Sequence, residues 1–335
     1  MKSKVERILI INLAFIGDVI LSTPVARALR AKYPNSRIDM LVVPVAAEVA
    51  VMNPYVDCVI EYDKKGRHRS WGALRQLVRQ LRAERYDLAV ATNFALRGAL
   101  IARASGAPCR LGYAAQHGEW FLTHASKPVR SAKRHEAENY LDVLKPLAIS
   151  AHDVSLTLQP PPEAYQELQS RFVKRSGEKW LVICPVGSYE RKSWSKEGYA
   201  ALIKALAGRA RIFLIGGQRE KAALDQIREM AEGQGEVLAG ELTLPQVAAL
   251  LQQSDLLVSV DTGPLHIGQG VGIPTLALYG PTDPAIWGPR GVRDRVIYHP
   301  DCEPCWGKGD CLEKKCMANI SQAEVIKNAM EMLGL

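Results

Sequence analysis

Short apolar runs alternate with segments of helical spacing along the whole chain. The first run, residues 7–13 (RILIINL), is almost free of polar residues, and a helical segment follows at 19–32. The other strands predicted in this half are 38–43, 56–62, 87–91, 110–113 and 121–124, and the other helices are 71–85, 95–105 and 135–147. Apolar strands that alternate with amphipathic helices are typical of a mostly parallel sheet with helices on both faces.

The same alternation restarts after the proline-rich segment 159–162 (QPPP), which is the best candidate for a domain boundary. The strands predicted in this half are 180–184, 211–215, 255–260 and 274–278. At 335 residues the chain exceeds the usual size of one domain. We therefore expect an α/β fold with two doubly wound, Rossmann-like domains, residues 1–159 and 160–320, that face each other across a cleft. An amphipathic helix within 321–335 would close the chain.

One stretch of the second half, residues 256–289, combines the elements that often build a ligand site. A buried strand ends at Asp261, a helix that carries His266 follows, and a second strand leads into another polar turn. Ligands of open α/β sheets bind at the carboxyl ends of strands. A helix that starts after Thr262 and Gly263 would also offer backbone N–H groups to an anion. The alternative is that Asp261 and Thr262 only cap the helix and that His266 packs against the turn.

Three other polar turns follow predicted strands. Asp18 comes shortly after the first strand, where it could take a proton from a hydroxyl group or only favour a helix N-terminus. Ser188 and Lys192 offer the hydroxyl and the ammonium that bind a diphosphate, although their loop could also be a solvated basic segment. Glu220 follows two glycines that permit close approach of a ligand, and its carboxylate could accept hydrogen bonds from ribose hydroxyls.

Several common patterns are absent from the sequence. It contains neither the dinucleotide fingerprint G-x-G-x-x-G nor a P-loop, and no Ser/His/Asp or Cys/His arrangement at an elbow-like turn. It shows no RRM, KH, helix-turn-helix or finger pattern, so nucleic acid is not an expected partner. No apolar run approaches the ~20 residues of a membrane span, and no signal-peptide pattern precedes the first strand. We therefore expect the protein in the cytoplasm.

Positive charge is concentrated in the first half of the chain. Residues 1–160 hold 23 Lys and Arg against 14 Asp and Glu, residues 161–335 hold 20 against 21, and the net charge is +8. The predicted loop after the third strand carries a run of cations: Lys64, Lys65, Arg67 and Arg69. Such a run is usually only solvated surface, but a basic surface also suits an anionic partner such as nucleic acid, anionic lipid or an acidic glycan.

Four of the seven cysteines lie within 15 residues: Cys302, Cys305, Cys311 and Cys316. In a chain expected in the cytoplasm, this cluster favours a structural metal site over disulfides. The spacing is looser than in paired C-x2-C zinc sites, so two disulfides or free thiols remain alternatives. Because the cluster is far from Asp18 in sequence, we expect it to stabilise the fold, and we expect no catalytic metal.

Three segments together resemble the heptosyltransferases of glycosyltransferase family nine. They are 16–20 (IGDVI), the loop with Ser188 and Lys192, and 261–266 (DTGPLH) followed by 279–283 (YGPTD). The resemblance covers essentially the whole chain and implies a GT-B fold with an acceptor domain followed by a nucleotide-sugar domain. It also implies an inverting enzyme that transfers L-glycero-D-manno-heptose from ADP-heptose to the inner core of lipopolysaccharide. ADP-heptose is then the donor substrate, and the chemistry requires no cofactor.

The resemblance implies a role for each polar turn. Asp18 would be the general base, and Lys192 would stabilise the charge that develops on the leaving diphosphate. The donor would be bound by Ser188, Lys192, Glu220, Asp261, Thr262, Gly263 and His266. The chain departs from the family at Gly187, where a second hydroxyl residue is common. In proteins of this fold the closing helix often packs back on the first domain.

The acceptor that the resemblance implies is acidic, because it carries Kdo carboxylates and lipid A phosphates. The cations of the 64–69 loop would bind it, and the basic first half would hold the enzyme at the inner face of the cytoplasmic membrane. Two other interpretations remain open. One is a GT-B enzyme with another nucleotide-sugar, either a glycosyltransferase or a sugar-nucleotide epimerase. The other is a non-catalytic protein that binds a nucleotide-sugar or a polyanion.

Overall fold

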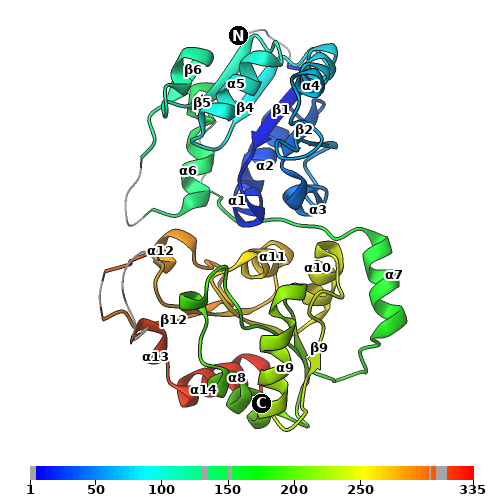
Figure 1. The fold of residues 1–335 in the computed structure, drawn as a ribbon, viewed down its shortest axis with the longest axis vertical. Coiled ribbons are helices and arrows are strands. Elements are labelled where there is room, and N and C mark those ends of the chain that lie inside the picture. Colours follow the sequence, from blue (N-terminus) through cyan, green and yellow to red (C-terminus); the bar gives the residue numbers. More distant parts are fainter. Residues whose placement is uncertain (1–4, 130–133, 150–152, 302, 307–314) are drawn as a thin grey trace. The chain divides into compact units, whose positions relative to one another are not determined.

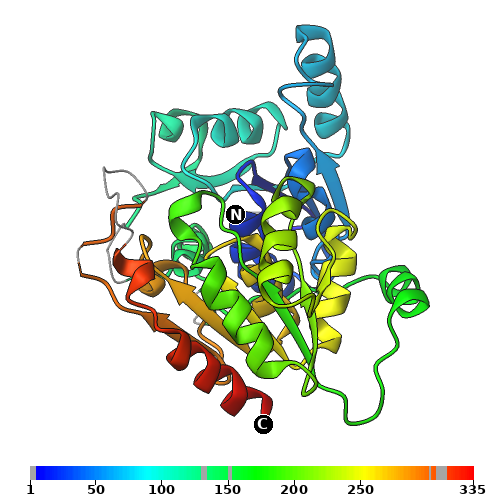
Figure 2. The same ribbon diagram turned by 60° about the horizontal axis from the view of Figure 1, so that its bottom comes forward.

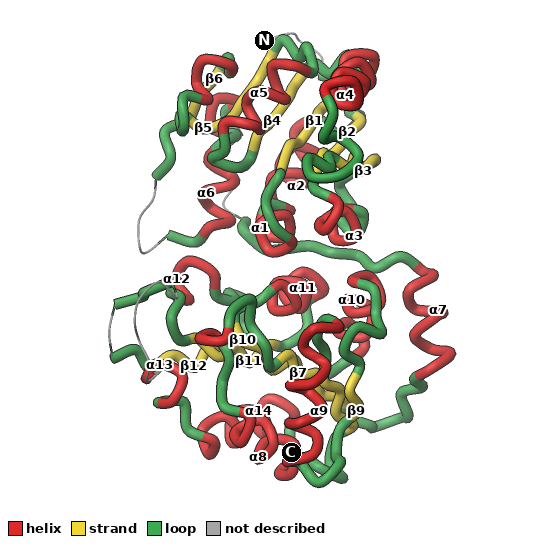
Figure 3. Tube along the Cα trace, in the orientation of Figure 1, coloured by secondary structure: helices red, strands yellow, loops and turns green. Residues whose placement is uncertain are grey.

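The computed structural model describes residues 5–129, 134–149, 153–301, 303–306 and 315–335. The chain divides into two compact units, Met1–Leu158 and Gln159–Leu335. Each unit contains one sheet with helices on both faces (Figures 1 and 3). The division falls at the first residue of the proline-rich segment.

The sheet of the first unit has six parallel strands in the order β3-β2-β1-β4-β5-β6. The strands are β1 (Arg7–Asn12), β2 (Arg37–Val42), β3 (Cys58–Glu61), β4 (Leu88–Ala91), β5 (Cys109–Tyr113) and β6 (His124–Ser126). Every residue of β1 after Arg7 is buried, because helices cover both faces of a parallel sheet. On one face Leu9 and Ile11 pack with Leu77 and Leu81 of α4 (Trp71–Ala83).

The other helices of the first unit are α1 (Ile16–Leu21), α2 (Thr23–Lys32), α3 (Ala47–Ala50), α5 (Leu96–Ala104) and α6 (Glu136–Asp142). The prediction of one helix over 19–32 is wrong, because Ser22 separates two helices. The Ser22 hydroxyl donates to the Val19 carbonyl and accepts a hydrogen bond from Asn12 Nδ2. Pro24 then lies in the first turn of α2, where its missing N–H has no cost.

Two further predictions for the first unit need correction. The helix predicted over 135–147 ends at Asp142, and a separate 3-10 turn, η3 (Lys145–Leu147), contains Pro146. The strand predicted at 121–124 is replaced by the 3-10 turn η2 (Gly118–Phe121) and by β6, which starts at His124. A proline and a short turn explain these differences, since neither continues the element that the apolar spacing predicted.

The second unit repeats this topology with the strand order β12-β11-β10-β7-β8-β9, again all parallel. The strands are β7 (Trp180–Cys184), β8 (Arg211–Leu214), β9 (Glu236–Val237), β10 (Leu256–Val260), β11 (Thr275–Tyr279) and β12 (Arg295–Tyr298). The helices are α7 (Pro162–Arg171), α8 (Lys196–Leu206), α9 (Lys221–Met230), α10 (Leu244–Gln253), α11 (Gly263–Val271), α12 (Pro284–Trp287), α13 (Lys315–Ala318) and α14 (Gln322–Leu333). The four strands predicted here are confirmed.

The closing helix α14 packs within the second unit. Val325, Ala329 and Leu333 are buried in the same core as Trp194, whose indole N–H donates to the Ile320 carbonyl at 3.0 Å. Figure 2 shows α14 (red) beside α8 (green). The buried face of α14 thus belongs to the core of the second unit, and the expectation that this helix packs back on the first domain stays a prediction.

In each sheet the strand order reverses at one point, between β1 and β4 and between β7 and β10. In each unit, the carboxylate of one aspartate joins the amino ends of these two strands by hydrogen bonds. Asp87 Oδ2 accepts the backbone N–H groups of Glu6 (2.9 Å) and Arg7 (3.2 Å). In the second unit Asp255 Oδ2 accepts the N–H of Trp180 at 2.8 Å. The carboxyl ends of the same strands form the crevice in which ligands of such sheets bind.

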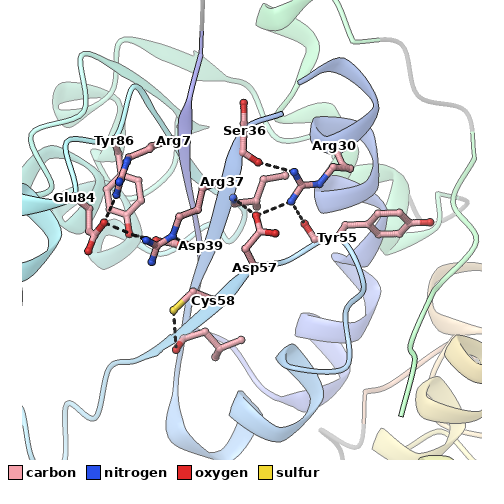
Figure 4. A network of polar contacts seen from close by, with 12 residues as sticks. Arg7, Arg30, Ser36, Arg37, Asp39, Tyr55, Asp57, Cys58, Glu84 and Tyr86 are labelled. Carbon is pink, nitrogen blue, oxygen red and sulfur yellow. Dashed lines mark hydrogen bonds and ion pairs between the residues drawn. The ribbon is translucent and has the colours of Figure 1, made fainter. Parts of the chain in front are cut away.

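A polar network stabilises the first unit near the amino ends of β1, β2 and β3 (Figure 4). The buried carboxylate of Asp39 accepts hydrogen bonds from Arg37 Nε at 2.8 Å and from the Tyr86 hydroxyl at 2.7 Å. Burial and the bond to Asp39 raise the pKa of Tyr86, so its hydroxyl remains a neutral donor. Asp57 binds Arg30 at 2.6 Å in the same region. These charged groups therefore lie away from the carboxyl ends of the strands.

Candidate functional site

Residues predicted to bind the donor gather at the carboxyl ends of β7 and β10. β7 leads into a loop that contains Ser188 and the 3-10 turn η4 (Glu190–Lys192), and β10 ends directly before Asp261. The Lys192 Nζ lies 2.6 Å from Asp261 Oδ2, and the two side chains are only 13% and 8% exposed. A largely buried ion pair thus joins the two sides of the crevice in the second unit.

Asp261 is the centre of the polar contacts in this crevice. Its Oδ2 also accepts a hydrogen bond from Thr282 Oγ1 at 2.8 Å, and its Oδ1 lies 4.0 Å from Nε2 of the buried His266. Burial and the charge of Asp261 raise the pKa of Tyr279, which therefore remains a neutral phenol. The structure brings together Lys192, the 261–266 segment with Asp261 and His266, and Thr282, which come from three separate segments.

Helix α11 begins in this crevice without a side-chain cap. Thr262 occupies the N-cap position with an extended backbone, but its side chain makes no cap hydrogen bond. The alternative that Thr262 caps the helix is therefore wrong. The first N–H groups of a helix have no partner within the helix. In α11 Pro264 has no N–H and the Leu265 N–H donates to the Thr262 carbonyl at 3.1 Å, so it is Gly263, next to the Lys192–Asp261 pair, whose N–H can bind an anion.

Gly187 allows Lys192 to lie across the end of β7. A Cβ atom at Gly187 would lie 2.6 Å from the Lys192 Cβ, which is closer than two such atoms approach. The stem of Lys192 therefore fills the space that a side chain at position 187 would need. The Lys192 Nζ also lies 5.0 Å from the centre of the Tyr189 ring. Burial, followed by the charge of Asp261, raises the pKa of Tyr189 to about 12.

Two other predicted donor ligands flank the crevice on its loops. Glu220 folds over the glycine turn after β8, where a Cβ at Gly217 would lie 2.7 Å from Glu220 Oε2. Ser188 is exposed on the loop after β7. A hollow of about 810 Å³ in the same unit is lined by Val186, Trp194 and other residues, but by none of the predicted donor ligands. The polar cluster at the strand ends is therefore the better candidate for the site.

Asp18 lies shortly after β1, in the first turn of α1. Its Oδ2 accepts the N–H of Phe15 at 3.3 Å, so the interpretation of Asp18 as a helix-terminal carboxylate is confirmed. Its Oδ1 accepts a hydrogen bond from the Tyr140 hydroxyl at 2.7 Å. The side chain is half-buried. Asp18 therefore combines a role at the helix end with a fixed position at the carboxyl end of β1.

Sequence reasoning missed two polar groups near this crevice. The helical spacing around Tyr140 marks it as a core residue, and only its hydroxyl signals a polar partner. Asn93 follows β4, on the other side of the crevice, and its side-chain oxygen is buried without a hydrogen-bond partner in the part of the chain that the structure describes. A buried carbonyl oxygen of this kind is a candidate ligand for a hydroxyl group.

The basic loop after β3 is a turn organised by Asp63. Its carboxylate accepts the backbone N–H groups of Lys65 (3.2 Å), Gly66 (2.8 Å) and Arg67 (3.0 Å). Arg67 pairs with Glu61 at 2.9 Å, so part of its charge is compensated. Within the described residues, the exposed ammonium groups of Lys64 and Lys65 have no ion-pair partner. Arg69, also exposed, follows on the same loop.

The predicted cysteine cluster lies partly outside the described residues, which exclude Cys302 and Cys311. Cys305 is half-buried and Cys316 is buried. Among the described side chains, no group of three or more His, Cys, Asp or Glu is arranged to bind a metal ion. In the same part of the chain, no helix has the length and apolar character needed to cross a membrane.

Comparisons with known proteins agree on one family. A family model described as glycosyltransferase family 9 (heptosyltransferase) matches residues 74–316. Lipopolysaccharide heptosyltransferase 3 of Escherichia coli is 28% identical over 287 residues, which cover 82% of this chain and 84% of that protein. The structure of a family 9 glycosyl transferase from Veillonella parvula superposes with a TM-score of 0.89 at 28% identity, covering 99% of this chain and 98% of the other. The E. coli ADP-heptose lps heptosyltransferase II shares the fold, with a TM-score of 0.81 at 23% identity and 98% coverage of both chains.

Proposed function

The chain belongs to glycosyltransferase family 9, and from that premise we propose that it transfers heptose from ADP-L-glycero-D-manno-heptose to the inner core of lipopolysaccharide. Its two Rossmann-like units are of the GT-B type. The observation that carries the proposal is the largely buried Lys192, held by Asp261 at the crevice of the second unit beside the uncapped start of α11. A fixed cation next to free N–H groups is what a diphosphate leaving group requires.

The donor half of the proposal assigns each residue one task. Lys192 and the N–H groups of Thr262 and Gly263 bind the diphosphate and stabilise the negative charge that it gains when the bond to the sugar breaks. Ser188 donates a hydrogen bond to a phosphate oxygen, and His266 completes the phosphate site. Glu220 accepts hydrogen bonds from the ribose hydroxyls of ADP, and Asp261 fixes the loop and Lys192.

For the acceptor, we assign the role of general base to Asp18. An acceptor hydroxyl gives its proton to Asp18 while its oxygen attacks the anomeric carbon on the face opposite ADP. The bond between that carbon and the phosphate oxygen breaks, its electron pair leaves with ADP, and the configuration at the anomeric carbon inverts. Deprotonation by a fixed carboxylate fits a half-buried side chain that two hydrogen bonds hold in place.

The basic first half binds the acidic acceptor in this proposal. Lys64 and Lys65 are exposed and carry charges that no described carboxylate compensates, so they contact carboxylates or phosphates of the acceptor, together with Arg67 and Arg69. The acceptor of such an enzyme is embedded in a membrane. The enzyme therefore acts from the cytoplasm at the inner face of the cytoplasmic membrane, which attracts a basic surface.

A transfer assay read by mass spectrometry tests the proposal. The protein is incubated with ADP-heptose, or with other ADP- and UDP-sugars, and a panel of truncated inner-core acceptors. We expect one added heptose on one acceptor with ADP-heptose only, and no transfer by Asp18→Asn, which keeps the shape of the side chain. Glu163→Gln, an exposed change at the start of α7, serves as the control and should transfer normally. Transfer from another sugar, or isomerisation of the donor without acceptor, would contradict the proposed activity.

A further inference from the structure

We infer that Tyr140 is a positioning residue for the base Asp18, an inference that rests on the proposed function. The Tyr140 hydroxyl donates to Asp18 Oδ1 at 2.7 Å from α6, an element 122 residues away in sequence. The other oxygen of Asp18 accepts only the longer bond from the Phe15 N–H at 3.3 Å. Tyr140 therefore provides the shorter of the two bonds that fix the rotation of the carboxylate.

Tyr140 can fix Asp18 because α6 is itself held in place. The Tyr113 hydroxyl donates to the carbonyl of Asn139, the residue before Tyr140. The Arg134 guanidinium spans the helix, with bonds to Glu138 at 3.3 Å and to Asp142 at 2.5 Å. The ring of Tyr140 is 2% exposed, so it has no room to turn away. The position of its hydroxyl is thus determined by the packing of α6.

The hydrogen bond also has a defined direction. Burial, and then the charges of Asp18 and Glu136, raise the pKa of Tyr140, so the phenol keeps its proton and donates it to the carboxylate. A donor to a carboxylate favours the ionised form, which is the form that accepts a proton. A carboxylate oxygen can accept two hydrogen bonds. Asp18 therefore retains acceptor sites for the substrate hydroxyl, whose proton moves to Asp18 and not to Tyr140.

The first unit contains a matched control for this arrangement. Tyr86 is also 2% exposed and donates to the carboxylate of Asp39 at the same distance of 2.7 Å. That pair lies in the network near the amino ends of the strands, away from the crevice. Tyr86→Phe and Tyr140→Phe thus remove the same kind of bond from the same unit, after which Asp39 keeps its bond from Arg37 and Asp18 keeps its bond from the Phe15 N–H.

The experiment compares heptose transfer and ADP binding in the wild type, Tyr140→Phe, Tyr86→Phe and Asp18→Asn. We expect Tyr140→Phe to lower kcat about 10- to 100-fold, because a base that is no longer held loses effective concentration. The Kd for ADP and the KM for the donor should not change. Tyr86→Phe should lower Tm by a similar amount and leave kcat within about twofold of the wild type.

The outcomes separate the inference from the proposed function. If Asp18→Asn abolishes transfer while Tyr140→Phe matches the wild type in kcat, the inference fails and the proposed base stands. If Asp18→Asn still transfers heptose, the proposed base itself fails. Should Tyr140→Phe not fold, 3-fluorotyrosine at position 140 keeps the ring and the hydroxyl but makes a stronger donor. The kcat should then differ from that of the wild type while the KM for the donor does not, and an unchanged kcat would overturn the inference.

Discussion

The Nζ of Lys192 lies 2.6 Å from Oδ2 of Asp261, in a crevice where both side chains are mostly buried. The cation that we assign to the diphosphate therefore already has an anionic partner before the donor binds. This partner offsets the cost of burying the ammonium, and it holds the long lysine side chain in one conformation. We expect a diphosphate that enters the crevice to share Lys192 with Asp261, whose Oδ2 also accepts the hydrogen bond from Thr282.

Lys192 should contribute to the chemical step as well as to donor binding. Lys192→Met keeps the length of the stem that covers Gly187 but removes the charge. We expect kcat to fall about 10²- to 10³-fold, the range for loss of one group that stabilises a developing anion. Steady-state kinetics with ADP-heptose measures the effect. Lys196→Met, an exposed change at the start of α8, is the control. Equal kinetics for the two variants would remove Lys192 from the mechanism.

A side chain at position 187 should displace Lys192. Gly187→Ala places a Cβ 2.6 Å from the Lys192 Cβ, so the lysine stem must move and its bond to Asp261 must lengthen. We expect about a tenfold loss in kcat/KM, because catalytic groups lose efficiency when they shift by a fraction of an ångström. Gly72→Ala, where the added methyl group meets open space, should retain full activity. A Gly187→Ala enzyme with wild-type kinetics would show that the lysine stem adapts.

The two uncompensated lysines of the basic loop should control acceptor affinity. Lys64→Ser/Lys65→Ser removes two exposed charges, and we expect the KM for the acceptor to rise about 10-fold at low salt, with a smaller effect at high salt. The KM for ADP-heptose should not change. The control is Arg75→Ser/Arg79→Ser, which removes the same charge from exposed positions on α4 of the same unit. If both double variants raise the acceptor KM equally, only the net charge of the unit matters.

The stability of the first unit should depend on pH through Asp142. Burial alone would raise the pKa of Asp142, but hydrogen bonds from Arg134 and Lys145 lower it below its usual value. A carboxyl group with a lowered pKa in the folded state stabilises the protein above its unfolded pKa of about 3.9. This contribution is lost as the pH falls through the folded pKa.

Thermal unfolding of Asp142→Asn and the wild type tests this dependence. The variant should melt at a lower temperature at pH 7, and the difference in Tm should shrink as the pH falls below 4. Asp225→Asn, which removes an exposed pair with Lys221 on α9, should change Tm little at either pH. A difference between Asp142→Asn and the wild type that stays constant with pH would show that Asp142 acts through its shape and not through its charge.

The sequence allowed most of the strands and the doubly wound topology to be predicted, because buried parallel strands appear as continuous apolar runs. The assignment of the site to the strand ends stays a prediction. Contacts between distant segments could not be predicted in the same way. Lys192 and Asp261 were assigned to one ligand, but nothing in their spacing of 69 residues shows that they pair. In the sequence, Gly187 indicates only that a hydroxyl side chain is absent. In the structure, the side chain of Lys192 fills the space beside Gly187. The break at Ser22 does not follow from the apolar pattern, because Pro24 cannot continue a helix from the preceding turn and starts a new one.

The two aspartates before β4 and β10 limit how each crevice can change width. Asp87 and Asp255 tie the starts of the two central strands together, and ladder hydrogen bonds join these strands along their length. The two central strands cannot move apart without breaking the hydrogen bonds of the aspartate and the hydrogen bonds between the strands. Within each unit, we therefore expect ligand binding to move the loops that follow the strands, while the central strands keep their pairing.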